Sequence, residues 1–266
     1  MNAVGIVGVG LIGGSFGLAL RKAGFTGSIV GVSSERSIAE AESCGAIDHG
    51  LSLEAAAASC DLLFLSQPIY GIIATLEKLG PLVRPGLLVT DAGSTKRVIV
   101  DAARRFLPPG SFLGGHPIAG KEVRGAAAGD GDLFRGRPWV LTEDLDHPVR
   151  HWIAATGARE LILDPDEHDR LLAWSSHLPQ LASTALASVL SEQTGAVKAV
   201  AGSGLMDMTR LGMSSFDLWR DILGTNEVAV AAALDAYIAK LQHLRDHFGK
   251  EFSQAGEFAR SLKQRG

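Results

Sequence analysis

Short apolar runs alternate with stretches of helical periodicity through roughly the first 165 residues of the chain. The apolar runs predict strands at Ala3–Val7, Ser28–Val32, Asp61–Leu65, Leu87–Asp91, Phe112–Gly114, Trp139–Leu141 and Glu160–Leu163. The helical stretches predict helices at Ser15–Ala23 and Arg36–Ser43. Strands that alternate with helices form βαβ units with parallel strands. We therefore expect an α/β domain of the Rossmann type, with a mostly parallel, doubly wound sheet.

The pattern changes after Asp164-Pro165, where strand-like runs stop and helical periodicity continues to the end of the chain. Apolar residues three and four positions apart form one continuous stripe, made of Leu234, Tyr237, Ile238, Leu241, Leu244 and Phe248. The helix that carries this stripe is predicted to begin near Asn226. So long a stripe needs a partner, within its own domain or across a dimer axis. We therefore expect two domains, residues 1–165 and an all-helical domain of residues 166–266.

The composition is that of an ordinary globular protein, with 46% hydrophobic and 20% charged residues and a formal net charge of −4. Nucleic-acid-binding domains usually carry a basic stripe, so this charge argues against nucleic acid, and also against an anionic membrane surface. No apolar run approaches the roughly 20 residues of a membrane helix, and no signal peptide is recognisable. Cys44 and Cys60 lack a metal or redox spacing and are predicted to be buried thiols. These features predict a cytoplasmic protein.

A glycine-rich turn directly follows the first predicted strand and opens the first helix, with the sequence Gly8, Val9, Gly10, Leu11, Ile12, Gly13. In a dinucleotide-binding unit, Gly8 permits the tight turn, Gly10 lets the backbone approach the pyrophosphate, and Gly13 allows the helix to pack closely on the strand. The helix N-terminus then stabilises the phosphate charge. A glycine-rich turn without a ligand is the alternative, which the strand–turn–helix context disfavours. We expect bound NAD(P).

The end of the second predicted strand bears on the choice between NAD and NADP. An Asp or Glu at this position would bind the ribose 2′-hydroxyl of NAD, whereas this chain has Ser33 and Ser34 there, followed by Glu35 and Arg36. The two hydroxyls can donate to a 2′-phosphate and Arg36 can neutralise it, which favours NADP. Glu35 is displaced from the usual position but can still serve NAD.

Three further segments combine polar residues with apolar surroundings: Thr90 to Lys96 after the fourth strand, Gly114 to Gly120 after a short strand, and His168 to Gln180 on the first helix of the second domain. In an open parallel sheet, the C-terminal ends of the strands face the ligand. We therefore expect the first two segments to contribute to the active site.

Together these segments resemble the prephenate/arogenate (cyclohexadienyl) dehydrogenase family of tyrosine biosynthesis. The resemblance covers nearly the whole chain, in the family's order: Gly8-x-Gly10-Leu11-Ile12-Gly13-Gly14-Ser15, Asp91-x-Gly93-Ser94-x-Lys96, Gly115-His116-Pro117-Ile118-Ala119-Gly120, His168-Asp169, Ser176-His177-Leu178-Pro179 and Asp207-Met208-Thr209-Arg210. It implies a Rossmann domain followed by a helical domain that forms a homodimer. It also implies an NAD(P)-dependent oxidative decarboxylation that yields 4-hydroxyphenylpyruvate or tyrosine together with CO₂.

His116 matches the family's catalytic histidine, and the chemistry supports that role. Hydride leaves a carbon that bears a hydroxyl, so a base must take the hydroxyl proton, and the ordinary pKa of histidine suits this task. Ser94 matches the serine that hydrogen-bonds this histidine and the substrate hydroxyl. A loop histidine with no catalytic part is the alternative for His116.

The substrate is a dianion, which favours recognition by a guanidinium group. Arg210 matches the family's carboxylate-binding arginine, and a surface arginine is its alternative. Pro179 is predicted to kink its helix, so that His177 and Gln180 can face the substrate; a buried structural role for His177 stays open. His168 is predicted to be structural and to help join the domains. His168 and His177 lie about half a turn apart on a straight helix, so no metal site is expected.

The chain also departs from the family pattern. Many relatives carry a histidine where this chain has Gln180, a position near the substrate side chain, so both prephenate and arogenate remain possible. Met206 replaces an arginine that often precedes Asp207, so an ion pair at Asp207 is expected to be missing. Gln67 and Pro68 follow the third strand and match the family's cofactor-lining loop.

Two other functions fit part of the pattern. A β-hydroxyacid dehydrogenase or imine reductase has the same two-domain plan. The β-hydroxyacid enzymes depend on a lysine of the helical domain, and neither Lys198 nor Lys240 lies in such a motif. A non-catalytic dinucleotide sensor would need neither His116 nor Arg210.

Overall fold

The computed structural model describes residues 1–193 and 195–263. The chain divides into two compact units. The first comprises Met1–Leu172 and Met213–Thr225, and the second comprises Ala173–Gly212 and the residues from Asn226 onward. The predicted boundary near residue 165 falls at the first residue of α7 (Pro165–Leu172), whereas the first unit continues to Leu172 and also takes in α11 (Phe216–Thr225).

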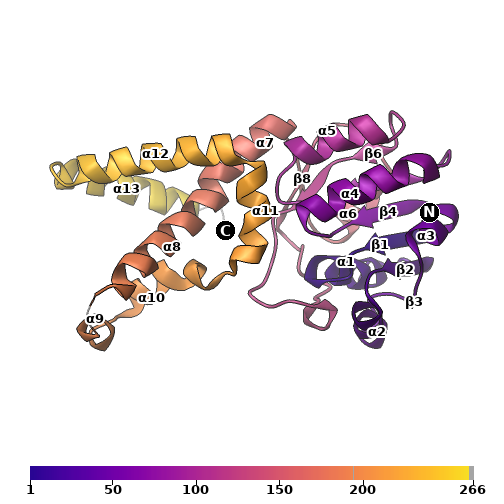
Figure 1. Ribbon diagram of the computed structural model, residues 1–266, viewed down its shortest axis with the longest axis horizontal. Coiled ribbons are helices and arrows are strands. Elements are labelled where there is room, and N and C mark those ends of the chain that lie inside the picture. Colours follow the sequence, from indigo (N-terminus) through magenta and orange to yellow (C-terminus); the bar gives the residue numbers. More distant parts are fainter. Residues whose placement is uncertain (194, 264–266) are drawn as a thin grey trace. The chain divides into compact units, whose positions relative to one another are not determined.

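A six-stranded parallel sheet forms the centre of the first unit, in the order β3-β2-β1-β4-β5-β6. Its strands are β1 (Ala3–Val7), β2 (Ser28–Val32), β3 (His49–Gly50), β4 (Leu62–Leu65), β5 (Leu88–Asp91) and β6 (Phe112–Leu113). The helices that connect them are α1 (Leu11–Lys22), α2 (Glu35–Ser43), α3 (Leu53–Ser59), α4 (Ile69–Leu79) and α5 (Arg97–Phe106) (Figure 1). This strand order is that of the Rossmann fold, as the sequence predicts.

Apolar side chains alternate between the two faces of this sheet, and each face has its own core. In β4, Leu62 and Phe64 belong to one core, whereas Leu63 and Leu65 belong to the other. Helix α1 covers the first face, where the rings of Phe16 and Phe64 lie 4.2 Å apart, centre to centre. Helices α3, α4 and α5 cover the second face. Because both faces are covered, the strands are apolar throughout their length.

A second, three-stranded sheet belongs to the same unit. Strand β8 (Pro138–Leu141) pairs antiparallel with β7 (Gly115–Pro117) and parallel with β9 (Arg159–Ile162). Helix α6 (Val149–Ala155) precedes β9. The ring of Trp139 packs among Phe16, Phe64 and Phe134, which joins this sheet to the core of the first. The sequence does not predict β7, because its three residues are too short to show an alternating pattern.

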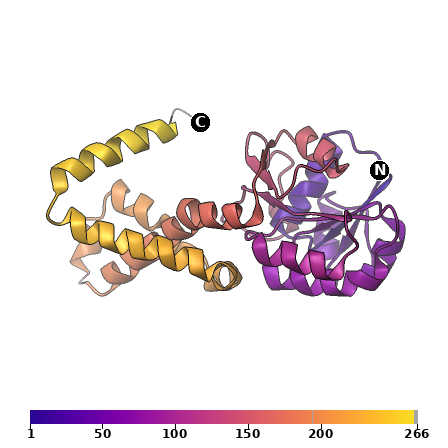
Figure 2. The ribbon, with the colours of Figure 1, turned by 90° about the horizontal axis from the view of Figure 1, so that it is seen from above.

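The second unit contains helices only within the part of the chain that the structure describes. They are α8 (Leu178–Ser191), α9 (Ala196–Ala199), α10 (Ser203–Thr209), α12 (Glu227–Leu244) and α13 (Phe248–Lys263), preceded by a π-helical turn at Ala173–His177. Helix α13 doubles back after α12, and Lys240 of α12 forms an ion pair with Glu251 of α13 at 3.0 Å (Figure 2).

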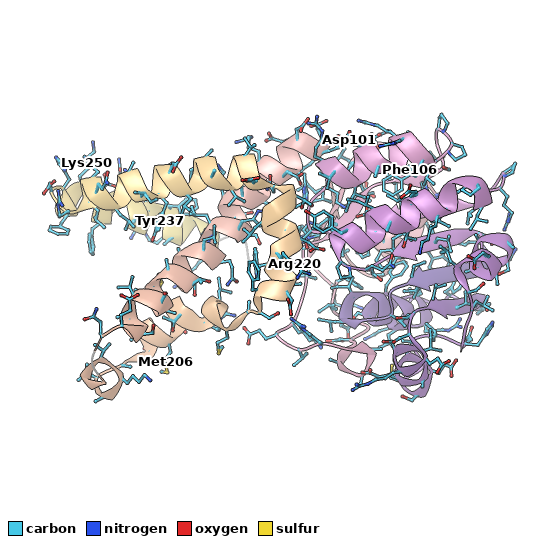
Figure 3. All side chains as sticks on the ribbon, in the orientation of Figure 1. Asp101, Phe106, Met206, Arg220, Tyr237 and Lys250 are labelled. Atoms are coloured by element: carbon cyan, nitrogen blue, oxygen red, sulfur yellow. The ribbon has the colours of Figure 1, made fainter. Side chains whose placement is uncertain are left out.

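Many apolar side chains of this helical unit remain exposed. Met206 of α10, which Figure 3 labels, is 62% exposed. Phe252 and Phe258 of α13 are 72% and 66% exposed. Exposed apolar patches of this kind mark contact surfaces. The apolar stripe that the sequence predicts to run to Phe248 is interrupted, because α12 ends at Leu244 and Phe248 begins α13.

Within the described residues, no single helix combines the length and hydropathy needed to cross a membrane. One bent pair, α11 with α12, meets those criteria by length and composition only.

Candidate active site

The glycine-rich turn has the geometry of a dinucleotide cradle. Gly8 adopts a φ of +93°, which favours glycine. A Cβ at Gly13 would lie 2.6 Å from Ser66 Oγ, so only glycine lets α1 approach β1 this closely. A Cβ at Gly10 would meet no atom within 4 Å, so the space beside this residue is open.

Helix α1 begins at Leu11 directly after this open space. Its N-cap residue, Gly10, has no side chain, and its first turn, which includes Leu11 and Ile12, contains no acidic residue. The first N–H groups of a helix lack intrahelical partners and attract anions. The turn therefore fits a pyrophosphate, which would be held by the backbone of Gly10, Leu11, Ile12 and Gly13.

The residues expected to choose between NAD and NADP lie at the end of β2. Ser33 and Glu35 line a surface hollow that α2 and Gly50 also border. Ser34 is the N-cap of α2, and its hydroxyl accepts a hydrogen bond from the Ser37 N–H, so it is partly engaged. Arg36 is exposed and forms no ion pair with any described residue.

Gln67 and Pro68 lie at the C-terminal end of β4, next to the glycine turn. The Gln67 side chain accepts a hydrogen bond from Thr75 at 2.9 Å, and its Cγ would lie 2.8 Å from a Cβ at Gly8. Pro68 is the N-cap of α4. Gln67 therefore borders the glycine turn, and Pro68 follows it in the chain.

Asp91, the last residue of β5, holds the two loops that follow neighbouring strands. One carboxylate oxygen accepts a hydrogen bond from the Gly115 N–H at 2.9 Å, and the other accepts one from the Gly93 N–H at 2.8 Å. Ser94 follows Gly93, and His116 follows Gly115. One buried carboxylate therefore fixes the loops that carry both predicted catalytic residues.

Lys96 completes this arrangement beneath the loops. Its ammonium forms an ion pair with Asp91, and both side chains are fully buried. Burial lowers the pKa of Lys96, because removal from water disfavours the charged form, while Asp91 and Asp169 oppose this effect. A buried, paired lysine of this kind is a structural element of the site.

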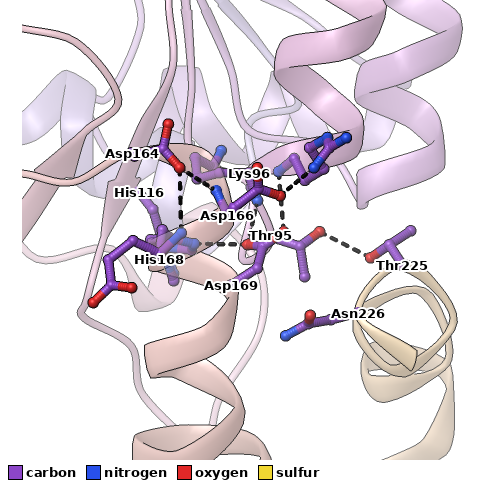
Figure 4. A network of polar contacts seen from close by, with 12 residues as sticks. Thr95, Lys96, His116, Asp164, Asp166, His168, Asp169, Thr225 and Asn226 are labelled. Atoms are coloured by element: carbon purple, nitrogen blue, oxygen red, sulfur yellow. Dashed lines mark hydrogen bonds and ion pairs between the residues drawn. The ribbon is translucent and has the colours of Figure 1, made fainter. Parts of the chain in front are cut away.

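His116 lies on β7 and is 9% exposed. Its Nδ1 atom lies 2.9 Å from Nε2 of His168, and Nδ1 of His168 lies 2.7 Å from Oδ1 of Asp169 (Figure 4). Asp169 also accepts hydrogen bonds from the N–H groups of Lys96 and Arg97, at 2.7 Å and 3.0 Å, and so caps the start of α5. His168 is therefore a direct partner of His116.

Ser94 is partly exposed beside this network. Its hydroxyl makes no hydrogen bond with any residue that the structure describes, so the expected bond to His116 is not formed here. The hydroxyl therefore retains its full capacity to donate and accept.

The other predicted substrate residues belong to the helical unit. Arg210 is exposed at the end of α10. His177 is buried, with Nδ1 3.2 Å from the side-chain nitrogen of Asn226. Gln180 is also buried, and its side-chain NH₂ donates to Thr184 at 3.1 Å and to the carbonyl of Leu211 at 2.8 Å.

Pro179 does not interrupt the middle of a helix. It lies in the first turn of α8, directly after the π-helical turn that ends at His177. A proline is tolerated at this position because the first N–H groups of a helix have no partner. Among the described residues, no group of three or more His, Cys, Asp or Glu side chains is placed to hold a metal ion.

Comparisons with known proteins show which family this chain belongs to. Residues 16–156 match "Prephenate dehydrogenase, nucleotide-binding domain", and residues 164–264 match "Prephenate dehydrogenase, dimerization domain". The chain belongs to the prephenate dehydrogenase family. It is therefore an NAD(P)-dependent dehydrogenase, as the sequence predicts.

Relatives support this assignment over nearly the whole chain. A prephenate dehydrogenase of Lactococcus lactis is 31% identical over 263 residues, which cover 97% of this chain and 74% of that protein. The structure of prephenate dehydrogenase from Aquifex aeolicus with hydroxyphenyl propionate and NAD⁺ superposes with a TM-score of 0.87 at 31% identity, and covers 99% of this chain and 96% of that one. Arogenate dehydrogenase from Synechocystis superposes with a TM-score of 0.78 at 30% identity, over 98% and 96% of the two chains.

Sequence reasoning did not predict the connection between His116 and His168. The pair His168-Asp169 stands out in the sequence as two adjacent polar residues. Their partners are distant in the chain, because His116 lies 52 positions before His168 and Arg97 lies 72 positions before Asp169. Nor did it predict that Asp91 holds both loops, since its Gly115 partner lies 24 positions further along the chain.

Proposed function

We propose that this dehydrogenase oxidatively decarboxylates prephenate or arogenate, with His116 as the base. The observation that supports this most is the joint attachment of the Ser94 and His116 loops to Asp91 at the C-terminal end of β5. The C-terminal ends of β1, β4 and β5 lie at one edge, because these strands are parallel. The glycine cradle and the proposed base therefore belong to the same edge of the sheet.

The reaction requires one proton acceptor from the protein. A bound NAD(P)⁺ supplies the acceptor for the hydride that leaves the ring carbon. His116 takes the hydroxyl proton from that carbon as the carbonyl forms, and the Ser94 hydroxyl orients the reacting oxygen. The ring carboxylate leaves as CO₂, and the two electrons of the broken C–C bond complete the aromatic ring. The former carbonyl oxygen takes back a proton from His116 and becomes a phenol.

Substrate anions need cationic and polar partners on the protein. We assign Arg210 to a substrate carboxylate, because its exposed guanidinium can form two parallel hydrogen bonds with it. We also assign His177 to the substrate-binding residues. The bond between His177 and Asn226 holds the imidazole in one orientation.

Gln180 favours arogenate as the substrate. Both of its amide protons are already donated, one to Thr184 and one to the Leu211 carbonyl. The Leu211 carbonyl can only accept, which fixes the orientation of the amide. The side chain therefore offers only its oxygen to a ligand, and an oxygen suits the ammonium of arogenate better than the keto-acid of prephenate.

We also propose that NADP is preferred to NAD. Ser33 stands where an acid would bind the ribose hydroxyls of NAD, and the exposed guanidinium of Arg36 can neutralise a 2′-phosphate. Glu35 lines the same hollow and is the feature that favours NAD. Ser33→Asp should therefore shift the preference toward NAD, and Arg36→Ala should weaken NADP more than NAD.

We further propose that the active protein is a cytoplasmic homodimer. Residues 164–264 match a dimerization domain, and α13 exposes Phe248, Phe252 and Phe258. A second copy of the chain would cover these rings. Both cysteines are free thiols, which is consistent with a reducing compartment.

The deciding experiment tests purified protein with four combinations, in which either NAD⁺ or NADP⁺ is the cofactor and either prephenate or arogenate is the substrate. Turnover is followed by the absorbance of the reduced nicotinamide. We expect the fastest turnover with arogenate and NADP⁺. Release of CO₂ in equal amount would confirm decarboxylation. No turnover with any pair would exclude the proposed reaction.

A further inference from the structure

Three side chains of the first unit form a continuous hydrogen-bonded line that ends at His116. Asp169 contacts Nδ1 of His168, and Nε2 of His168 contacts Nδ1 of His116. All three side chains are at least nine-tenths buried. The two imidazole rings meet nearly edge to face, with centres 5.1 Å apart, so each ring is held in one orientation.

The Asp169 carboxylate, at the other end of this line, determines which nitrogen of each ring carries the proton. A carboxylate accepts hydrogen bonds and does not donate them. Asp169 is already the acceptor for the N–H groups of Lys96 and Arg97, so toward His168 it is an acceptor as well. The proton of neutral His168 therefore lies on Nδ1, and its Nε2 is left as an acceptor. Nδ1 of His116 must then carry the proton that lies between the two rings.

We propose that Asp169 and His168 are positioning residues that hold neutral His116 in the tautomer protonated at Nδ1, so that its Nε2 is the basic atom. The inference rests on the proposed role of His116 as the base. It assigns to His168 a task in the reaction, where the sequence predicts only a structural link between domains. A carboxylate that fixes a catalytic histidine directly, as in serine proteases, has a comparable effect; here a second imidazole is inserted between them.

The surroundings of His168 keep this ring neutral. Burial lowers the pKa of His168, and the Lys96 ammonium acts in the same direction, whereas Asp169 and Asp91 raise it. Among the residues that the structure describes, these groups and His116 are the titratable side chains that act on the ring, from α7, β5, β7 and the start of α5. If His168 were charged, its Nε2 would donate to His116, the His116 proton would move to Nε2, and no base would remain.

The same line stabilises His116 after it accepts the substrate proton. The Nδ1–H of the imidazolium donates to Nε2 of His168, and the negative charge of Asp169 lies behind it. Proton transfer from substrate oxygen to Nε2 of His116 breaks one O–H bond and forms one N–H bond, while the Nδ1 proton stays in place. No proton has to leave the line during the chemical step.

The first test reads the tautomers without any substrate. In protein labelled with ¹⁵N at histidine, long-range ¹H–¹⁵N correlation distinguishes nitrogens that carry a proton from those that do not. His116→Asn and His168→Gln identify the two spin systems among the eight histidines. We expect protons on Nδ1 of both rings and none on either Nε2. A proton on Nε2 of His116 in the resting protein would overturn the proposal.

The second test compares two variants at position 168. Gln places its oxygen near the position of Nε2 and can still accept from His116, whereas Leu cannot. We expect His168→Leu to lower kcat by about 10- to 100-fold, a loss below that of the base itself, with KM and cofactor affinity nearly unchanged. His168→Gln should recover most of this loss. Equal losses in the two variants would overturn the proposal.

The pH profile separates positioning from a merely structural effect. In His168→Leu, the ionisation of His116 in the kcat profile should move to lower pH, because its imidazolium loses an acceptor and the charge of Asp169 behind it. In His168→Gln this ionisation should move less. An unchanged profile in His168→Leu would overturn the proposal. If His168→Leu does not fold, the tautomers of the unaltered protein still decide. An inactive wild-type protein would instead count against the proposed reaction and leave the tautomer test valid.

Discussion

The ammonium group of Lys96 forms an ion pair with the carboxylate of Asp91, and neither side chain has any exposure to solvent. Removing one partner of a buried pair leaves the other charge without compensation. We expect Lys96→Met to lower the free energy of unfolding by about 3–5 kcal/mol, measured by urea denaturation. Lys78→Met, at an exposed position of α4, should change it by less than about 0.5 kcal/mol.

Lys96→Met should also reduce turnover, because Asp91 holds the loops of Ser94 and His116. The loss should appear mainly in kcat, with the cofactor still bound at the separate glycine turn. A variant as stable and as active as the unaltered protein would show that Asp91 keeps the loops in place without its lysine.

The sheet of the first unit follows from local pattern, whereas the polar network around His116 does not. The strands are buried on both faces, so each is a continuous apolar run that the sequence reveals directly, as at Leu62–Leu65. Helix α5, by contrast, begins without a side-chain cap of its own, and Asp169, some 70 positions away, supplies the acceptor for its first N–H groups. Periodicity carries no information about such a distant partner.

The end of α12 is a second feature that the periodicity of apolar residues does not predict. The apolar period continues from Leu244 to Phe248, but the helix ends between them without a glycine or proline to mark the break. The family motifs carry information that periodicity does not, because they record residues such as His116 and Ser94 whatever their local pattern.

His147 makes the stability of the first unit depend on pH. Burial lowers its pKa from 6.5 to about 4, because the charged form loses its hydration. The unfolded chain therefore binds a proton that the folded chain excludes. The stabilisation is complete above pH 6.5 and is lost as the pH falls toward 4. The expected loss is about 3 kcal/mol.

His147→Asn isolates this contribution. The Val149 N–H donates to Nδ1 of His147, and the oxygen of Asn can replace that acceptor without titrating in this range. Urea denaturation across the same pH range should show a flatter dependence for the variant, even if its stability at neutral pH is lower. Parallel curves for the two proteins would mean that His147 is not the group responsible.

His116→Asn should remove the base and leave the surrounding contacts intact. The amide nitrogen of Asn lies near the position of Nδ1 and can still donate to His168. We expect kcat to fall by about 10²–10⁴, the usual range for lost acid–base catalysis, with unchanged affinity for the cofactor. His49→Asn, at an exposed position of β3, serves as the control. Full activity of His116→Asn would remove His116 from its proposed role.

Substitution by alanine should change the free energy of unfolding at Gly13 but not at Gly10. A Cβ at Gly13 would press on Ser66 and on the carbonyl of Gly8, so Gly13→Ala must separate α1 from β1. We expect it to destabilise the fold by about 1–3 kcal/mol, the usual cost of an overpacked core. A Cβ at Gly10 meets open space, so Gly10→Ala should keep the unfolding free energy within about 1 kcal/mol.

That same methyl group at Gly10 would occupy the space proposed for the pyrophosphate. We therefore expect Gly10→Ala to weaken NADP⁺ binding by about tenfold or more, equivalent to at least about 1.4 kcal/mol, in a fluorescence titration. Its melting temperature without cofactor should match that of the unaltered protein, and the increase in melting temperature on adding cofactor should be smaller. Equal affinities would show that the dinucleotide does not approach the backbone at Gly10, and the cradle would then have to lie elsewhere along the edge of the sheet.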